Sequence, residues 1–132
     1  MPHDIASLTE VPFDKIAIPD PKIAPYGKTC IEYLKKIGIY EEIKHKIIWA
    51  QNVGQVNQFV ESNHVDLGFS SLSSIIIRKD IDSSQFHIVK ELNQDHTMIL
   101  LHTSKTNDCI DSFYNYLHSE EARNIFAIFG LE

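Results

Sequence analysis

The sequence predicts an α/β fold with a largely parallel sheet, and two observations carry that prediction. Short apolar segments of strand length alternate with longer segments whose apolar residues recur at helical spacing. Strand–helix–strand order of this kind indicates crossover connections between parallel neighbours. The 132 residues suffice for a compact domain with its own core, and 43% hydrophobic and 23% charged residues are ordinary for a globular protein.

Breakers and caps delimit the expected elements of the first part of the chain. A strand at 15–18 ends at Pro19-Asp20-Pro21, and a helix at 26–37 is closed by Gly38 in the C-cap role. The same periodicity predicts a short helix at 40–45, a strand at 46–50, a helix at 53–62, a strand at 65–69 and a segment at 70–78 that begins as a helix.

The last part of the chain is expected to finish with two amphipathic helices. A polar loop at 80–85 precedes it, and strands are expected at 86–89 and 97–102. The helices are expected at 107–117 and 119–129, separated by a sharp break at His118-Ser119. No internal repeat and no low-complexity tract interrupts this order.

Charge and motif spacing argue against several classes of function. The net charge of −6 argues against nucleic acid and against an anionic membrane surface, and no apolar run approaches the ~20 residues of a membrane span. The N-terminus has no signal-peptide pattern. Histidine and cysteine spacings match no zinc site, and the serines match no nucleophile motif, so neither a cationic metal site nor an enzyme is expected.

The two cysteines are interpreted as buried thiols, with a structural disulfide as the minority alternative. Cys30 and Cys109 fall on predicted helices far apart in the chain. Cys30 also lies near a helix start, a position that can lower a thiol pKa, but no partner histidine is indicated.

Three expected helix starts lack the acidic residues that the helix dipole usually attracts. The first carries Tyr26, Gly27 and Lys28, the second carries Val53, and the third is the segment 68–74, "GFSSLSS". Each follows an expected strand, so the three starts meet at the carboxyl edge of a parallel sheet. Exposed N–H groups gathered there would suit an anion, and a nearby carboxylate would compete with it.

These residues carry a resemblance to a known family. The strand leading to Pro-x-x-Ala-Pro-Tyr-Gly, the Asn-Val-x-Gln helix start, Phe-Val-Glu-Ser, Asp-x-Gly-Phe and the C-terminal "FYNYLHSEEARNIFAIFGLE" resemble the second lobe of periplasmic molybdate-binding proteins, the solute-binding subunits of molybdate ABC transporters. The resemblance runs from about Leu8 to Leu131. It implies a periplasmic-binding-protein-like lobe with the family's first lobe missing from this chain.

The resemblance also implies a division of the chain and a set of ligand contacts. It implies a lead-in segment at 1–14, an α/β domain at 15–93, and a return strand with C-terminal helices at 94–132 that pack on the first lobe in the family. Tyr26 and Val53 match ligand-contacting positions. Ser71 falls where some members place a contacting tyrosine, and Ser70 or Ser71 remains a weaker candidate.

The implied function is that of a partial solute-binding component with molybdate or tungstate as ligand and no cofactor. The implied partner is an ABC transporter permease, and the implied location is the periplasm. The alternatives are a binding protein for another small anion such as sulfate, and a stand-alone lobe that oligomerises without binding anion. Apolar residues on the last two helices, among them Phe126 and Phe129, lead us to expect a homodimer.

Overall fold

The structure is a computed structural model that describes residues 5, 10, 12–96 and 108–131. It divides into two units, Met1–Gln94 and Asp95–Glu132, and each is described by itself. None of the described helices is long and apolar enough to cross a lipid bilayer.

The first unit is built on a three-stranded parallel sheet with the strand order β2-β1-β3. Its strands are β1 (Ile16–Pro19), β2 (Ile47–Ala50) and β3 (Leu67–Gly68), and Pro19 pairs with Ala50 while Ala17 pairs with Gly68. All four residues of the central strand β1 are buried. The predicted parallel α/β fold is therefore confirmed for this unit.

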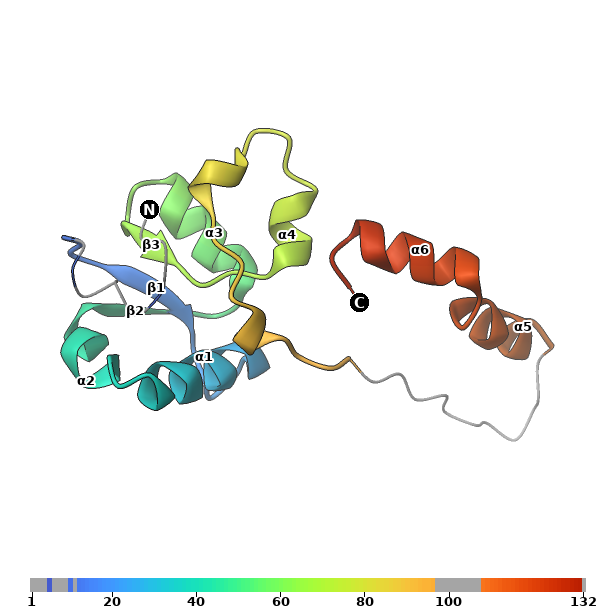
Figure 1. Cartoon of the computed structure of the whole chain (residues 1–132), viewed down its shortest axis with the longest axis horizontal. Coiled ribbons are helices and arrows are strands. Elements are labelled where there is room, and N and C mark those ends of the chain that lie inside the picture. Colours follow the sequence, from blue (N-terminus) through green and yellow to red (C-terminus); the bar gives the residue numbers. More distant parts are fainter. Residues whose placement is uncertain (1–4, 6–9, 11, 97–107, 132) are drawn as a thin grey trace. The chain divides into compact units, whose positions relative to one another are not determined.

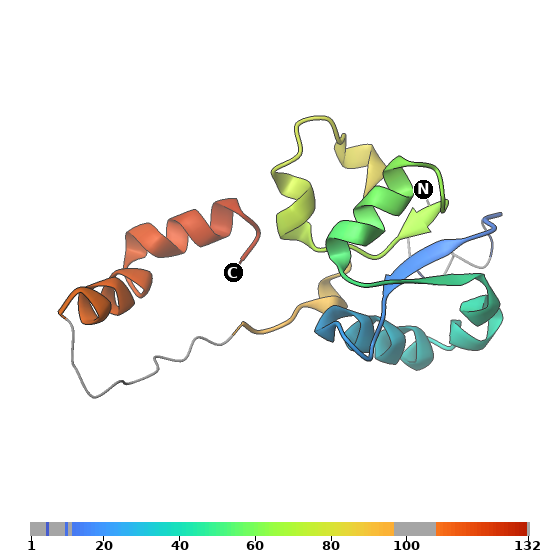
Figure 2. The ribbon, with the colours of Figure 1, turned by 180° about the vertical axis from the view of Figure 1, so that it is seen from behind.

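Helices on both faces of the sheet connect these strands (Figures 1 and 2). The chain passes from β1 to β2 through α1 (Pro25–Lys36), α2 (Tyr40–Ile43) and a 3-10 turn at Lys44–Lys46, and from β2 to β3 through α3 (Val53–Glu61). The two connections run in opposite directions along the sheet. Right-handed crossovers therefore place α1 and α3 on opposite faces.

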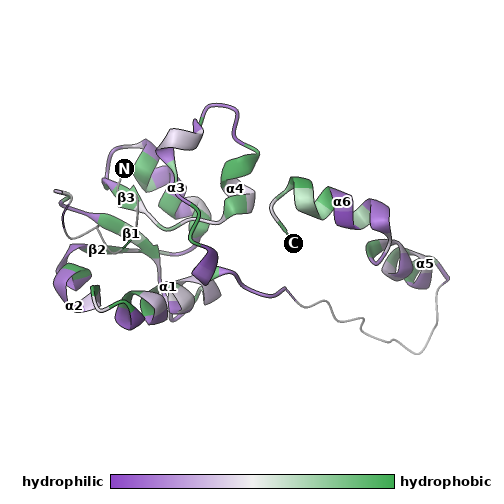
Figure 3. Ribbon diagram, in the orientation of Figure 1, coloured by the Kyte–Doolittle hydropathy of each residue, from purple (hydrophilic) through white to green (hydrophobic). Residues whose placement is uncertain are grey.

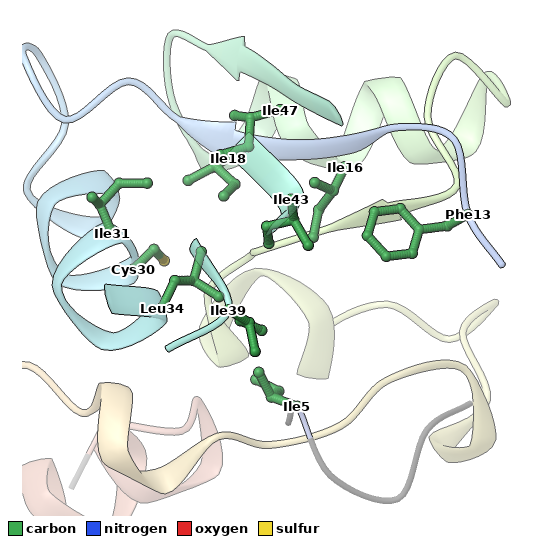
Figure 4. Packing of buried hydrophobic residues seen from close by; sticks show 10 residues of the cluster. All are labelled: Ile5, Phe13, Ile16, Ile18, Cys30, Ile31, Leu34, Ile39, Ile43 and Ile47. Atoms are coloured by element: carbon green, nitrogen blue, oxygen red, sulfur yellow. The ribbon is translucent and has the colours of Figure 1, made fainter. Parts of the chain in front are cut away.

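Alternate residues of β1 pack into two separate hydrophobic clusters. Ile16 and Ile18 join the larger cluster, which also contains Leu34 of α1 (Figure 4). Ala17 points the other way and packs with Val56 of α3. This alternation follows from the two-residue period of a strand, and it explains why a strand covered on both faces is apolar throughout.

The strand β3 is held in place by the residues on either side of it. The Asp66 carboxylate accepts the backbone N–H groups of Asp14 and Lys15, each at 2.9 Å, and so ties the start of β1 to β3. A Cβ atom at Gly68 would lie 2.5 Å from Val56 Cγ1, so only glycine lets α3 pack this closely. The Asp-x-Gly-Phe segment thus has a structural explanation.

The chain beyond β3 differs from the prediction at one element. Helix α4 (Leu72–Ile76) occupies the segment that was expected to begin as a helix, and 3-10 turns follow at η3 (Ser83–Gln85) and η4 (Lys90–Leu92). The strand predicted at 86–89 is wrong, because residues 86–89 pair with no strand. Ile88 is exposed there, while Val89 packs on the larger cluster.

The described part of the second unit consists of α5 (Asp108–Leu117) and α6 (Glu120–Ile128). Ser119 separates them as predicted, and its side chain accepts the Ala122 N–H at 3.2 Å. Both helices mix hydrophobic and hydrophilic residues (Figure 3). The strand predicted at 97–102 and residue 107, the first residue of the helix expected at 107–117, lie outside the described residues.

Candidate functional site

The candidate site lies at the carboxyl edge of the sheet, where β1 and β2 end side by side. Pro19 and Ala50 are paired, and the N–H of Asp20 donates to Ala50 O at 2.7 Å just beyond them. From this point the chain runs to α1 on one face and to α3 on the other, so both helices begin at the same end of the sheet (Figures 1 and 2). Such a divergence between neighbouring strands is where open α/β sheets bind ligands.

The start of α3 is capped, yet two of its N–H groups remain available. The Asn52 side chain accepts the Gln55 N–H at 2.9 Å, and the Gln55 side chain accepts the Gln51 N–H at 2.7 Å. Among the described residues, no acceptor takes the backbone N–H of Val53 or Gly54. The first turn contains no acid. Val53 therefore begins a helix that presents backbone donors to this edge.

At the start of α1, two residues can be excluded as backbone donors to an anion. Ala24 makes no side-chain cap, and the first turn contains no acid. Pro25 has no N–H, and the Gly27 N–H donates to Ala24 O at 3.0 Å, so neither serves an anion. The prediction for α1 therefore concerns Tyr26, and its role as a ligand contact stays a prediction.

Gly27 is required by packing against the end of β1. A Cβ atom there would lie 2.0 Å from Pro19 O and 2.9 Å from Pro21 N. The presence of glycine at this position is therefore explained by packing. At Gly54, in contrast, a Cβ atom would meet only Asn52 Oδ1, at 3.1 Å.

The charged residues near these helix starts do not place a carboxylate in the first turn of either helix. Lys28 lies 3.9 Å from Glu32 one turn along α1, and both side chains are exposed. An exposed pair of this kind contributes little to stability. The Asp20 carboxylate, in the loop before α1, accepts the Lys22 N–H at 2.9 Å.

The serine segment forms a polar cluster with Asn57 of α3. Ser70 Oγ donates to Asn57 Oδ1 at 2.6 Å, and Asn57 Nδ2 donates to Ser74 Oγ at 3.2 Å. Ser74 Oγ donates in turn to Ser71 O at 2.9 Å, and Ser73 Oγ donates to Ser71 Oγ at 3.3 Å. Ser70 and Ser71 precede α4, which is too short to supply a strong helix dipole.

Two residues of this region could not be identified as site residues from the sequence. Asn57 carried no signal, because a polar residue between Val56 and Gln58 is equally compatible with a solvent-facing position. Gln94, far along the chain, donates from Nε2 to Pro25 O at 3.3 Å and also contacts Thr29 Oγ1. It therefore lies beside the start of α1.

Neither a cation nor a nucleophile is indicated among the described residues. No group of three or more histidine, cysteine, aspartate or glutamate side chains in the described ranges is arranged to hold a metal ion. Burial raises the pKa of Cys30 to about 12, so the lowered pKa considered for this thiol is wrong. Cys30 is buried as expected, whereas Cys109 is exposed and departs from that expectation.

Comparison with known proteins identifies a family that the chain matches and solved structures that share its fold. The family model for bacterial extracellular solute-binding proteins matches residues 1–132. The molybdate-binding protein ModA of Rhodobacter capsulatus is 27% identical over 129 residues, which are 96% of this chain and 50% of that protein. The putative ABC transporter substrate-binding lipoprotein YvgL of Bacillus subtilis (strain 168) is 30% identical over 123 residues, 89% of this chain and 45% of that protein.

Two solved structures share the fold. The periplasmic molybdate-binding protein of Azotobacter vinelandii matches with a TM-score of 0.63 and 21% identity, over 92% of this chain and 55% of that one. The substrate-binding domain of a putative molybdenum ABC transporter from Clostridium difficile matches with a TM-score of 0.67 and 24% identity, over 96% and 56%. The chain thus spans about half the length of the relatives it matches.

Proposed function

Because this chain belongs to the bacterial extracellular solute-binding protein family, we propose that it provides half of a binding site for a tetrahedral oxyanion, with molybdate or tungstate as the favoured ligand. In this proposal the donors are the backbone N–H groups of Tyr26 and Val53. The Ser70–Ser71 segment contributes a hydroxyl.

One observation supports this assignment above the others. Two acid-free helix starts follow the paired ends of β1 and β2, and the N–H groups of Val53 and Gly54 have no acceptor among the described residues. Neutral, oriented N–H dipoles can bind a dianion without a cationic pocket, which fits a chain of net charge −6. Such a site offers few acceptors to a proton-bearing anion, so it favours molybdate over hydrogen phosphate.

The wider role follows from the relatives and is part of the proposal. Curated relatives are named as molybdate-binding proteins and as an ABC transporter substrate-binding protein. We therefore propose that the chain acts by binding, not by catalysis, and that it needs no cofactor. Its proposed place is the periplasm or cell exterior, where it delivers the anion to an ABC transporter permease.

The proposal is tested by adding sodium molybdate to the ¹⁵N-labelled chain and following backbone amide shifts. We expect the largest shifts at Tyr26, Val53 and Gly54, with a smaller response at Ser71. Sodium chloride at matched ionic strength is the control for screening, and tungstate and sulfate rank the anions. Shifts confined to surfaces away from the carboxyl edge of the sheet would refute the site.

A further inference from the structure

We propose that Asn57 is a positioning residue of the oxyanion site, which holds the Ser70–Ser71 segment so that Ser71, and not Ser70, donates a hydroxyl proton to the anion. This inference rests on the proposed function. It assigns different roles to two serines that the sequence leaves equivalent.

The assignment follows from counting hydroxyl protons in the cluster. Each serine hydroxyl has one proton to donate. The proton of Ser70 goes to Asn57 Oδ1, at 2.6 Å, and that of Ser74 goes to the carbonyl oxygen of Ser71, at 2.9 Å. The proton of Ser73 goes to Ser71 Oγ at 3.3 Å. Among the described residues, no acceptor takes the proton of Ser71.

The Asn57 amide makes this arrangement self-consistent. Its oxygen accepts from Ser70 while its nitrogen donates to Ser74 at 3.2 Å. The Ser74 proton can be shared between Ser71 O, at 2.9 Å, and Ser70 Oγ, at 3.0 Å. Ser71 Oγ, which accepts from Ser73, becomes a better donor because hydrogen bonds in a chain polarise one another.

Asn57 also links the Ser70–Ser71 segment to the helix that begins with Val53. It lies one turn along α3 from Val53, and its side chain is half-buried. Without it, the described contacts leave the Ser70 hydroxyl with Ser74 alone as its partner. The Ser70–Ser71 segment would lose its hydrogen bonds to α3, and the position of the Ser71 donor would no longer be fixed.

The test uses the labelled chain, with molybdate as the probe and a double-mutant cycle. We expect Ser71→Ala to weaken molybdate binding by roughly two- to tenfold, since it removes one hydrogen bond to an anion that keeps much of its contact with water. Asn57→Ala should weaken binding less, and its effect should disappear in the Ser71→Ala background because it acts through Ser71. Gln58→Ala, an exposed change on the same helix, is the matched control.

A second readout tests positioning without any ligand. Asn57→Ala should speed hydrogen exchange at the amides of 70–74 while leaving those of α1 unchanged. Ser70→Ala removes the same hydrogen bond from the other side, so it should reproduce both effects if Asn57→Ala fails to fold.

The possible failures are distinguishable. A wild-type chain that shows no molybdate-dependent shift refutes the proposed function and the donor role of Ser71 together. If the wild-type chain binds molybdate as expected, either of two results refutes only the role of Asn57. In the first, the effects of Asn57→Ala and Ser71→Ala simply add; in the second, Ser70→Ala costs as much binding as Ser71→Ala. Unchanged exchange at 70–74 in Asn57→Ala refutes the positioning role directly.

Discussion

Val53 allows a backbone contribution to anion binding to be separated from a side-chain one. Proline at this position removes the N–H but suits the first turn of a helix. The preceding residue, Asn52, is already extended, with φ −161° and ψ 175°, which a following proline prefers. We therefore expect Val53→Pro to keep the fold and to weaken molybdate binding by roughly two- to tenfold.

Val53→Ala is the matched control, because it keeps the N–H and shortens only the side chain. Binding should be nearly unchanged in this variant, as judged by the same amide titration. An equal loss of binding in the proline and alanine variants would assign the effect to the valine side chain and would contradict the backbone model.

The two helix-start glycines should respond differently to alanine. A Cβ atom at Gly27 would overlap Pro19 O, so Gly27→Ala should push α1 from the end of β1 and cost about 1–3 kcal/mol of folding free energy or more. Gly54→Ala meets only the Asn52 side chain and should change stability little. Urea unfolding of both variants checks this, and similar losses would mean that Gly27 is not a packing position.

At the scale of elements, the sequence predicts correctly those elements whose signals lie in residues close together along the chain. The helix that ends at Lys36 was predicted because apolar spacing and Gly38 are local signals, and Gly38 indeed has a positive φ of 84°. The strand predicted at 86–89 is wrong because local signals do not show whether a partner strand is present, and a strand forms only with a partner. The expected strand at 65–69 is likewise shorter, and β3 covers only Leu67–Gly68.

The candidate site was predictable to a similar extent. The lack of acid near Tyr26 and Val53 is visible in the sequence, and parallel topology places both starts at one edge of the sheet. The role of Asn57 depends on contacts with residues that follow β3, so no local sequence pattern predicts it. The same holds for Gln94 beside the start of α1.

The link between β1 and β3 should make the sheet sensitive to acid. Hydrogen bonds from the Lys15 and Asp14 N–H groups lower the pKa of Asp66 in the folded chain. The stabilisation is therefore present above the unfolded pKa and is lost as the pH falls through the folded pKa. We expect Asp66→Asn to lower the free energy of unfolding at neutral pH, and this difference from the wild type should shrink as the pH is lowered.

Urea unfolding at a series of pH values measures that difference. Glu42→Gln, which removes an exposed carboxylate from α2, controls for the loss of one negative charge. A gap between wild type and Asp66→Asn that stays constant down to the most acidic pH would show that the carboxylate charge does not contribute through these hydrogen bonds.

At the scale of the whole molecule, half a site should bind weakly. The chain spans about half the length of its relatives, and an anion bound to one lobe keeps much of its contact with water. Each hydrogen bond then contributes only ~0.5–1.5 kcal/mol net. We expect a dissociation constant for molybdate in the millimolar range or weaker, measured by calorimetry. Submicromolar binding by a proven monomer would show that the site is misplaced.

The last two helices lead to a prediction about association. Their described residues expose large apolar side chains, including Phe113 at 62% and Ile128 at 67%, while the small Ala122 is buried. Exposed apolar area of this extent on one short unit tends to recruit a partner. We therefore predict a homodimer at micromolar concentration, with Phe126 or Phe129 in the interface.

Sedimentation velocity tests this association directly, and two substitutions on α6 sharpen it. Phe129→Ser removes an exposed aromatic side chain and should shift the chain toward the monomer, since the dimer loses buried apolar area. Asn124→Ser changes an exposed polar residue of the same helix and should leave the dimer intact. A wild-type chain that stays monomeric at micromolar concentration would mean that α5 and α6 cover their apolar residues within one chain, because burial there would remove the area that drives association.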